Sequence, residues 1–415
     1  MGWPVGGSLT DAVSLGVLAA SIPREAVDEA VAVCGRSARR SGGKLPPHVM
    51  VYFAMALALF AAEDYEEVLA RLSDALARWG CWDRGWVRPG SSGIAQARQR
   101  LGDEPLRYLF EQVARPVASL LTRGAWLGHR RLVSVDGMEW DVPDTAANVA
   151  EFGYRGGTRQ ESAFPKVRMV TFSECGTHAM FAARLCPPTG AGNGEMGAAR
   201  LLYPLLEPGM LLLADRNFYG FEDWCQAADT GADLLWRIGA SVQLPPVKAL
   251  ADGSYLSLVF AKRLHRPERE RLIARAKAGQ DLAEIGDRAR IVRVVEYRVE
   301  GRGDTGEVIA LATTVLDPGD LPAESLAAAY HERWEHESGH DQLTTHLRGP
   351  GRVLRSKSPA MVRQEIYGYL LTHHAISTLI CRAATEAGID PDRVKFQRTV
   401  RLVRRRIDDP AAFSP

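Results

Sequence analysis

The stretch RLVSVDGMEWDV, from Arg131 to Val142, marks the point where the chain changes from helical to extended patterning. Before it, Ala- and Leu-rich segments recur with helical spacing from Thr10 to about Arg123. Within it, the apolar residues run together and then alternate, as in a β-strand. The apolar run ends at Asp136, which directly precedes a glycine. We therefore predict a strand that carries an acid.

The elements predicted after this strand indicate an α/β fold. VRMVTFSE (167–174) and HAMFAARL (178–185) are separated by the turn CGT and predict a hairpin. A predicted helix, 195–207, precedes the buried-type strand MLLLAD, which ends on Asp215. An acid on the first strand and another at the end of the fourth fit the opening topology of an RNase H-like mixed sheet, flanked by helices.

The pattern changes again after residue 240. Charged, alternating sequence with a turn at 301–306 predicts a separate β-rich insertion, and a long helix resumes near Glu324. Seven basic residues and no acid lie between Arg393 and Arg406, which indicates either a phosphate-contacting helix or a solvated end. We divide the chain into a helical amino-terminal domain, the first part of the core, the insertion, the second part of the core and a basic tail, at residues 1–125, 126–240, 241–325, 326–385 and 386–415.

The composition argues against a membrane-spanning protein but excludes few other classes of protein. The 415 residues carry 51 Lys+Arg against 50 Asp+Glu, so a nucleic-acid partner would have to be held by local basic patches. The longest apolar run, Val49 to Ala62, is shorter than the roughly 20 residues that span a bilayer and predicts a buried helix. The amino terminus shows no export signal, and the scattered cysteines predict reduced thiols. We expect a cytoplasmic protein.

The segment YHERWEHESGHD, Tyr330 to Asp341, carries two incompatible signatures. One is H-E-x-x-H at 336–340, which holds zinc in metallopeptidases. A third ligand is missing at the expected spacing, so a zinc peptidase is disfavoured. The other is Tyr330, Arg333 and Glu337, which lie on one face of a regular α-helix together with position 344.

A second decoy is GNGEMG, 192–197, which matches the glycine pattern of dinucleotide-binding loops. Such a loop begins directly at the end of a parallel strand. Here the preceding strand belongs to the hairpin, and Glu195 would face the phosphates. We reject this interpretation.

Three acids, Asp136, Asp215 and Glu337, fall on the first strand, the fourth strand and the later helix of the predicted sheet. Brought together, they would repel one another unless cations neutralise them, and oxygen-only ligands favour Mg²⁺ or Mn²⁺. Two such ions can drive an in-line attack on phosphorus.

The blocks SVDGMEWDVPDT, LLLADRNFYGFEDW and YHERWEHESGHDQLTTHLRG resemble the DDE transposases of bacterial insertion sequences, in the insertion-element-four family. The resemblance implies that Asp136, Asp215 and Glu337 are catalytic and bind two Mg²⁺ or Mn²⁺ ions. It also implies that Tyr330 and Arg333 hold DNA phosphates. The family pattern Y-x-x-R-x-x-x-E-x6-K ends on a lysine, where this chain has Thr344.

Three further positions are candidates for binding DNA in the segment SSGIAQARQRLGDEP. Gln96, Arg98 and Arg100 lie on a predicted short helix, closed by Gly102, that could be part of a helix-turn-helix. The alternative is a solvated helix face. Arg216, directly after the second acid, is a further phosphate candidate.

The resemblance implies an enzyme that binds terminal inverted repeats in double-stranded DNA, cleaves there and joins the ends to target DNA. Two ends cut in one complex imply a homodimer on DNA, with no membrane partner. Thr344 leaves open a catalytically impaired DNA-binding remnant, and an RNase H-like nuclease without strand transfer also remains an alternative.

Overall fold

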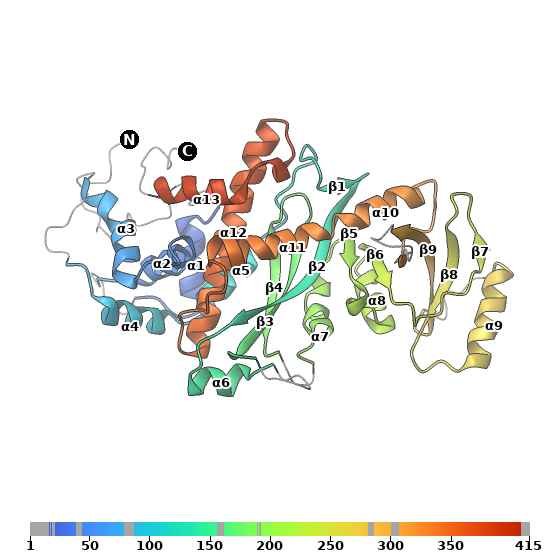
Figure 1. Ribbon diagram of the computed structural model, residues 1–415, viewed down its shortest axis with the longest axis horizontal. Coiled ribbons are helices and arrows are strands. Elements are labelled where there is room, and N and C mark those ends of the chain that lie inside the picture. Colours follow the sequence, from blue (N-terminus) through green and yellow to red (C-terminus); the bar gives the residue numbers. More distant parts are fainter. Residues whose placement is uncertain are drawn as a thin grey trace.

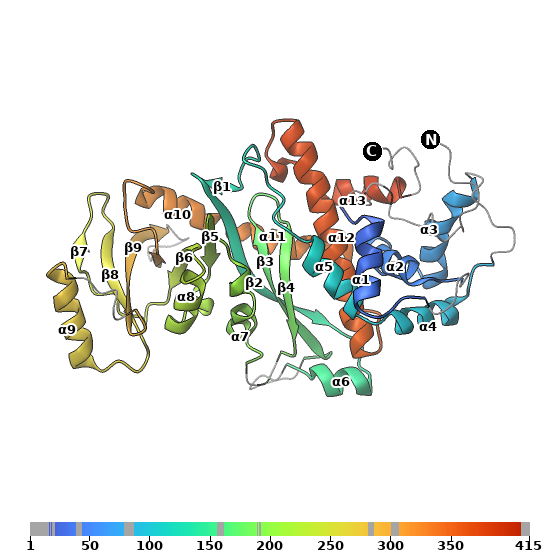
Figure 2. The same cartoon turned by 180° about the vertical axis from the view of Figure 1, so that it is seen from behind.

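The computed structural model describes residues 16, 18, 21–38, 44–78, 87–155, 162–188, 190, 192–280, 286–299 and 307–407. The molecule is elongated, with the amino-terminal helices at one end, a large sheet in the middle and the strands of the 241–325 segment at the other end (Figures 1 and 2). The predicted α/β architecture is confirmed.

One mixed sheet runs through the molecule in the order β4-β3-β2-β5-β6-β10-β9-β8-β7. Its strands are β1 (Trp126–Leu127, paired with β2), β2 (Arg130–Asp141), β3 (Lys166–Glu174), β4 (Met180–Cys186), β5 (Met210–Ala214), β6 (Asp233–Ile238), β7 (Lys248–Ala249), β8 (Tyr255–Phe260), β9 (Ala289–Val299) and β10 (Glu307–Thr313). Strand β2 is antiparallel to β3 and parallel to β5, which is itself parallel to β6. The strands β4, β3, β2 and β5, all predicted from the sequence, form the RNase H-like part of the sheet together with β6, which was not predicted.

The strands of the 241–325 segment extend this sheet, so our expectation of a separate insertion is corrected. Strand β10 pairs antiparallel with β6, and β9, β8 and β7 follow outward. The unpaired edge that β6 would otherwise expose is thereby covered. Periodicity along the sequence predicted the strands but could not identify the strand that β10 joins.

Helices cover the sheet and build the amino-terminal end. They are α1 (Arg24–Val33), α2 (Pro47–Leu59), α3 (Tyr65–Arg78), α4 (Ser91–Leu101), α5 (Glu104–Val113), α6 (Ala146–Phe152), α7 (Glu195–Arg200), α8 (Phe221–Ala228), α9 (Arg266–Lys277), α10 (Ala323–His331), α11 (Trp334–Asp341), α12 (Pro359–Glu386) and α13 (Phe396–Arg405). Helix α2 is buried along almost its whole length and packs against α12. No helix among the described residues is long and apolar enough to cross a bilayer.

The segment from α10 to α11 follows one path across the sheet, but it is not a regular α-helix (Figure 1). The backbone N–H groups of Arg333 and His336 each donate to the carbonyl three residues back, at 3.2 and 3.0 Å. These bonds tighten the turn between the two helices into 3₁₀ geometry. After Asp341 the chain widens into a π-helical segment, Gln342–Leu347.

Candidate active site

The strand register brings Asp136 and Asp215 to the same edge of the sheet. Strands β2 and β5 pair in parallel, and their last paired residues are Val135 and Ala214. Each acid is the next residue along its strand, so the two occupy neighbouring positions. Asp136 Oδ1 accepts the Gly137 N–H at 2.8 Å, and Asp215 Oδ1 accepts the Arg216 N–H at 2.6 Å.

Arg333 connects this edge to Glu337. Its Nη1 lies 3.5 Å from Asp136 Oδ2, and its Nη2 lies 3.3 Å from Glu337 Oε1. The Tyr330 hydroxyl, one turn earlier, donates to the Ala214 carbonyl at 3.5 Å. The turn between α10 and α11 therefore lies over the middle of β2 and the carboxyl end of β5. It places Arg333 in contact with Asp136 and Glu337, and the charge of Asp215 also raises the pKa of Arg333.

The electrostatics of this edge are dominated by negative charge. Burial raises the pKa of Asp136 to about 6, with smaller upward contributions from Glu195 and Glu337, against the Gly137 N–H and Arg333, which lower it. Burial acts to lower the pKa of Arg333, but Tyr330 and the acids outweigh it and raise the pKa. Arg333 Nε is buried without a hydrogen-bond partner. This edge of the sheet therefore has more carboxylate oxygens than hydrogen-bond donors, and one donor, Arg333 Nε, makes no hydrogen bond.

A fourth acid, Glu195, lies beside this group and was not among the predicted site residues. It is the first residue of α7, and its side chain packs against the backbone of Gly137, where an added Cβ would come within 2.9 Å of the Glu195 Cγ. The signal in the sequence was the glycine-rich loop before α7, which we considered only as a nucleotide-binding pattern. A side chain at position 137 would displace Glu195 from this place.

Comparisons with known proteins identify the family of the chain. Residues 12–111 match the family described as "Insertion element 4 transposase N-terminal", and residues 127–373 match the family described as "Transposase DDE domain". The chain belongs to the DDE transposase family. The transposase is 26% identical over 378 residues to "Transposase InsG for insertion sequence element IS4" of Escherichia coli (strain K12), covering 90% of this chain and 78% of that protein.

Among solved structures, the transposase resembles the piggyBac transposase in a synaptic complex with hairpin DNA. The TM-score is 0.48 at 10% sequence identity, over 95% of this chain and 80% of the other.

The H-E-x-x-H histidines of the transposase are part of its core. His336 is buried, and both ring nitrogens lie 2.8 Å from hydroxyl groups, those of Ser134 and Thr171. Burial lowers the pKa of His336 and holds that of His340 at about 4, so both rings are neutral. With its two nitrogens engaged, His336 cannot ligate zinc, which excludes the peptidase interpretation.

The helix α4 carries the predicted DNA-contacting residues on different faces. Gln96 and Arg100 are exposed, as is Arg216 beside Asp215. Arg98 is only 2% exposed, and its guanidinium is bonded to Gln364 at 2.8 Å and to Tyr65 at 2.5 Å. The prediction that Arg98 reads DNA is therefore wrong, because this side chain anchors α4 to α12.

Thr344 lies in the π-helical segment, where it is half-buried and its hydroxyl donates to the His340 carbonyl at 2.9 Å. A π-turn contains more residues than an α-turn, so each residue rotates less about the axis. The 3₁₀ turn before α11 has the opposite effect, so the stripe of a regular helix does not fix the direction in which position 344 faces. The simple helical register used in the sequence analysis is corrected accordingly.

Proposed function

We propose that this transposase binds the terminal inverted repeats of an insertion sequence, cleaves the DNA there and transfers the ends to target DNA. One observation carries the proposal: Asp136 and Asp215 are neighbours in register, and Arg333 ties Asp136 to Glu337. Three acids from distant parts of the chain then surround one point at the edge of a sheet.

The donor set fits divalent cations. Asp136, Asp215 and Glu337 offer carboxylate oxygens only, which suits Mg²⁺ or Mn²⁺. The desolvated Asp136 carboxylate gains most from a nearby cation, because burial disfavours its charged form. Two bound ions would supply an activated water or 3′-hydroxyl and a stabilised leaving oxygen.

Other residues of this edge would position the DNA. Arg333 has an unused Nε donor and a planar fork that matches a phosphate, and it would move its hydrogen bonds from the acids to the backbone of the cut strand. Tyr330, which already lies against β5, would contact the same cut strand of the DNA. Arg216 would contact a neighbouring phosphate from the exposed side of Asp215.

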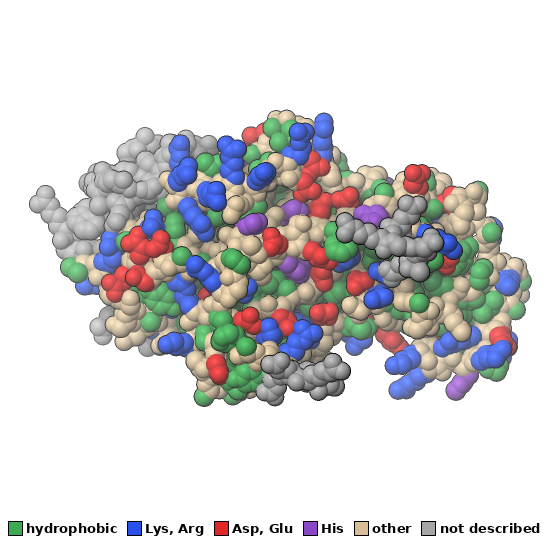
Figure 3. Space-filling model, in the orientation of Figure 1, with side chains coloured by type: hydrophobic (Ala, Val, Ile, Leu, Met, Phe, Trp, Pro, Cys, Tyr) green, Lys and Arg blue, Asp and Glu red, His purple; other side chains and the backbone are tan. Residues whose placement is uncertain are grey.

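Two exposed surfaces would add affinity away from the cut. Gln96 and Arg100 on α4 would contact double-stranded DNA, and α13 carries basic side chains with its apolar side buried. Lys and Arg side chains gather over α12 and α13 beside the acids at the centre of the same face (Figure 3). We propose a homodimer on DNA, so that two ends are cut in one complex.

The test compares three variants with a control on a cognate end. Asp136→Asn, Asp215→Asn and Glu337→Gln should each lower cleavage by at least about a thousandfold, because the charge of the transition state is left unscreened. All three should still retard end DNA in a gel. Glu324→Gln, an exposed acid at the start of α10, should cut normally. Near-normal cleavage by any of the three variants would overturn the assignment.

The same assay separates the two alternatives. A DNA-binding remnant would retard the end but leave it uncut with either Mg²⁺ or Mn²⁺. A nuclease without strand transfer would cut the end but yield no joined product with a plasmid target.

A further inference from the structure

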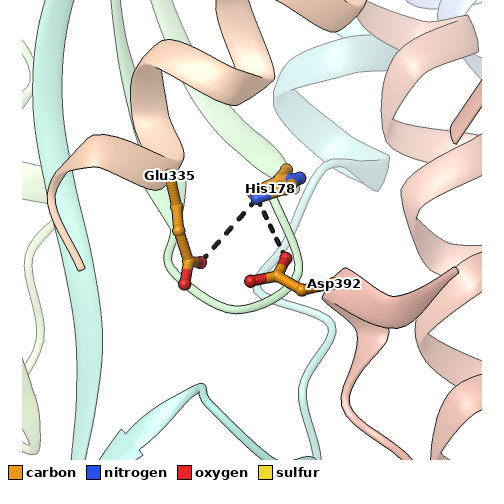
Figure 4. A group of neighbouring side chains, drawn as sticks. All are labelled: His178, Glu335 and Asp392. Atoms are coloured by element: carbon orange, nitrogen blue, oxygen red, sulfur yellow. Dashed lines mark ion pairs between the residues drawn. The ribbon is translucent and has the colours of Figure 1, made fainter. Parts of the chain in front are cut away.

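A second group of ligand atoms lies on the other side of α11. His178 Nε2 lies 3.2 Å from Asp392 Oδ1 and 3.8 Å from Glu335 Oε2 (Figure 4). The ligand atoms of the three residues all lie within 4.8 Å of one another. They come from the turn between β3 and β4, from α11 and from the 3₁₀ turn Pro391–Arg393 that precedes α13.

This group is distinct from the acids around Arg333. The Glu335 carboxylate accepts the Gly176 N–H, whereas the Glu337 carboxylate faces Arg333. The two glutamates are only two residues apart, but they leave opposite sides of the helix.

The imidazole of His178 is directed at the two carboxylates. Its Nε2 atom is buried and makes no hydrogen bond, and it points between Glu335 and Asp392 (Figure 4). The other nitrogen, Nδ1, lies 2.7 Å from the side-chain nitrogen of Gln342, whose side-chain oxygen lies 2.9 Å from His373 Nε2. An amide in this place holds the ring in one orientation, as the outer partner of a metal-bound histidine does.

We propose that His178, Glu335 and Asp392 form a site for one divalent transition-metal ion, with Zn²⁺ as the best fit. Two carboxylates this close to one imidazole are stabilised by a cation between them. One nitrogen and two oxygen ligands match zinc sites with three protein ligands, and nitrogen disfavours Mg²⁺. Gln342 would turn its oxygen to the Nδ1–H of His178 and its NH₂ to His373, leaving the Nε2 lone pair for the metal.

The surroundings supply a fourth ligand and a way in. His178 and Asp392 line a cavity of about 630 Å³, together with Lys395 and Phe396 of the tail. Water from this cavity would complete the tetrahedron. The ion would tie the hairpin turn and the tail to α11, the helix that also carries Glu337, so its role is structural.

The test measures metal directly and does not depend on DNA cleavage. The full chain is stripped with a chelator, returned to excess Mg²⁺ to occupy oxygen-only sites, and titrated with ZnCl₂ by calorimetry. We expect one Zn²⁺ per chain and a higher melting temperature, since binding to the folded state alone is stabilising. His178→Phe, Glu335→Gln and Asp392→Asn should each weaken Zn²⁺ binding by at least a hundredfold.

Two controls separate this site from the acids around Arg333. Asp136→Asn, which removes one of those acids, and Glu324→Gln should retain the bound Zn²⁺. Co²⁺ in place of Zn²⁺ should give visible absorption that Asp392→Asn, a conservative change at a largely accessible side chain, abolishes without unfolding the chain. Unchanged Zn²⁺ affinity in Asp392→Asn, or no Zn²⁺ binding by the wild type, would overturn the proposal and leave a shared proton between the acids.

Discussion

Arg333 and Arg98 are both buried arginines, 9% and 2% exposed, but they are bonded to different kinds of partner. Arg333 lies among carboxylates at the sheet edge, and one of its nitrogens has no hydrogen bond. Arg98 donates to neutral oxygens of Gln364 and Tyr65, and to Ser356 at 3.3 Å. Each of its nitrogens is used within the protein.

The difference separates an arginine available to a ligand from one that holds the fold together. Arg98 cannot bind a phosphate without leaving buried partners unsatisfied, which costs roughly 1 to 3 kcal/mol for each. Arg333 balances acids that would instead be neutralised by metal ions, so its donors can pass to DNA. Burial alone therefore does not decide the role of an arginine; the charge of its partners does.

Among the variants that test this comparison, the largest effect is expected from Arg333→Met. Removing the fork should lower single-turnover cleavage of end DNA by at least about a hundredfold, because both the countercharge and the phosphate donor are lost. Arg333→Lys keeps the charge but not the planar fork, so its cleavage rate should lie between those of the wild type and Arg333→Met. Wild-type cleavage by Arg333→Met would remove the distinction between the two arginines.

Arg98→Met should act on stability. We expect the free energy of unfolding to fall by about 2 to 4 kcal/mol in urea denaturation, because buried oxygens of Gln364 and Tyr65 lose their donor. Cleavage per folded molecule should be unchanged. The matched control is Arg100→Met on the exposed face of α4, which should leave stability within about 0.5 kcal/mol and weaken end binding. The reverse pattern would return Arg98 to the DNA surface.

A buried histidine, His374, tests in the same way whether a buried polar side chain serves the stability of the fold, here through the pH dependence of stability. His374 on α12 donates to the Met180 carbonyl at 3.2 Å, and burial lowers its pKa from the model-compound range to about 4. Since the unfolded chain binds this proton more readily, the stability that the neutral ring contributes is present above about pH 6.5 and is lost as pH falls toward 4.

The expected loss from this one group between pH 8 and pH 5 is about 2 kcal/mol. His374→Gln keeps a donor for the Met180 carbonyl but cannot titrate. Urea denaturation at both pH values should show the variant losing less stability than the wild type by that amount. Identical pH dependence in the two proteins would mean that the folded protein binds this proton as readily as the unfolded chain does.

The sequence was sufficient to predict the strands that carry or precede Asp136 and Asp215, because a strand carries its own period. The parallel register of β2 and β5 is seen only in the structure. The partners of Arg98 could not be predicted, because Gln364 and Ser356 lie more than 250 positions away along the chain. The polar side chains of α4 indicated one exposed helix face. Only the packing of α4 on α12 shows that some of these side chains are exposed whereas Arg98 is buried.

The same limit applies to the sites. Asp136, Asp215 and Glu337 lie in three motifs that were identified separately, whereas His178, Glu335 and Asp392 share no motif and meet only in the fold. Glu195 reaches the acids through the start of α7, a placement that no local pattern specifies. The sequence motifs thus located the group of candidate residues that includes Glu337 of α11. The tertiary structure was needed to find the group that includes Glu335 of the same helix.

The smallest effect is expected from Thr344→Lys, which adds a cation at the position where the family pattern given in the sequence analysis ends on a lysine. Thr344 is half-buried in the π-helical segment, so a lysine there would have to extend its stem along the surface to reach the DNA. If it gains one phosphate contact, end binding should strengthen by about 1 kcal/mol at low salt, with a log-log salt slope steeper by about one unit. Cleavage should rise or stay level, since the acids are untouched.

The measurement is a salt titration of affinity for one end DNA, with Thr345→Lys as the matched control. Position 345 lies in the same π segment and is also half-buried, but it is rotated by one residue about the axis. A general gain in positive charge would steepen both slopes equally, whereas a specific phosphate contact would steepen only that of Thr344→Lys. If neither slope changes, the π segment turns position 344 away from the DNA, and Arg333 remains the cation of this helix that meets the cut strand.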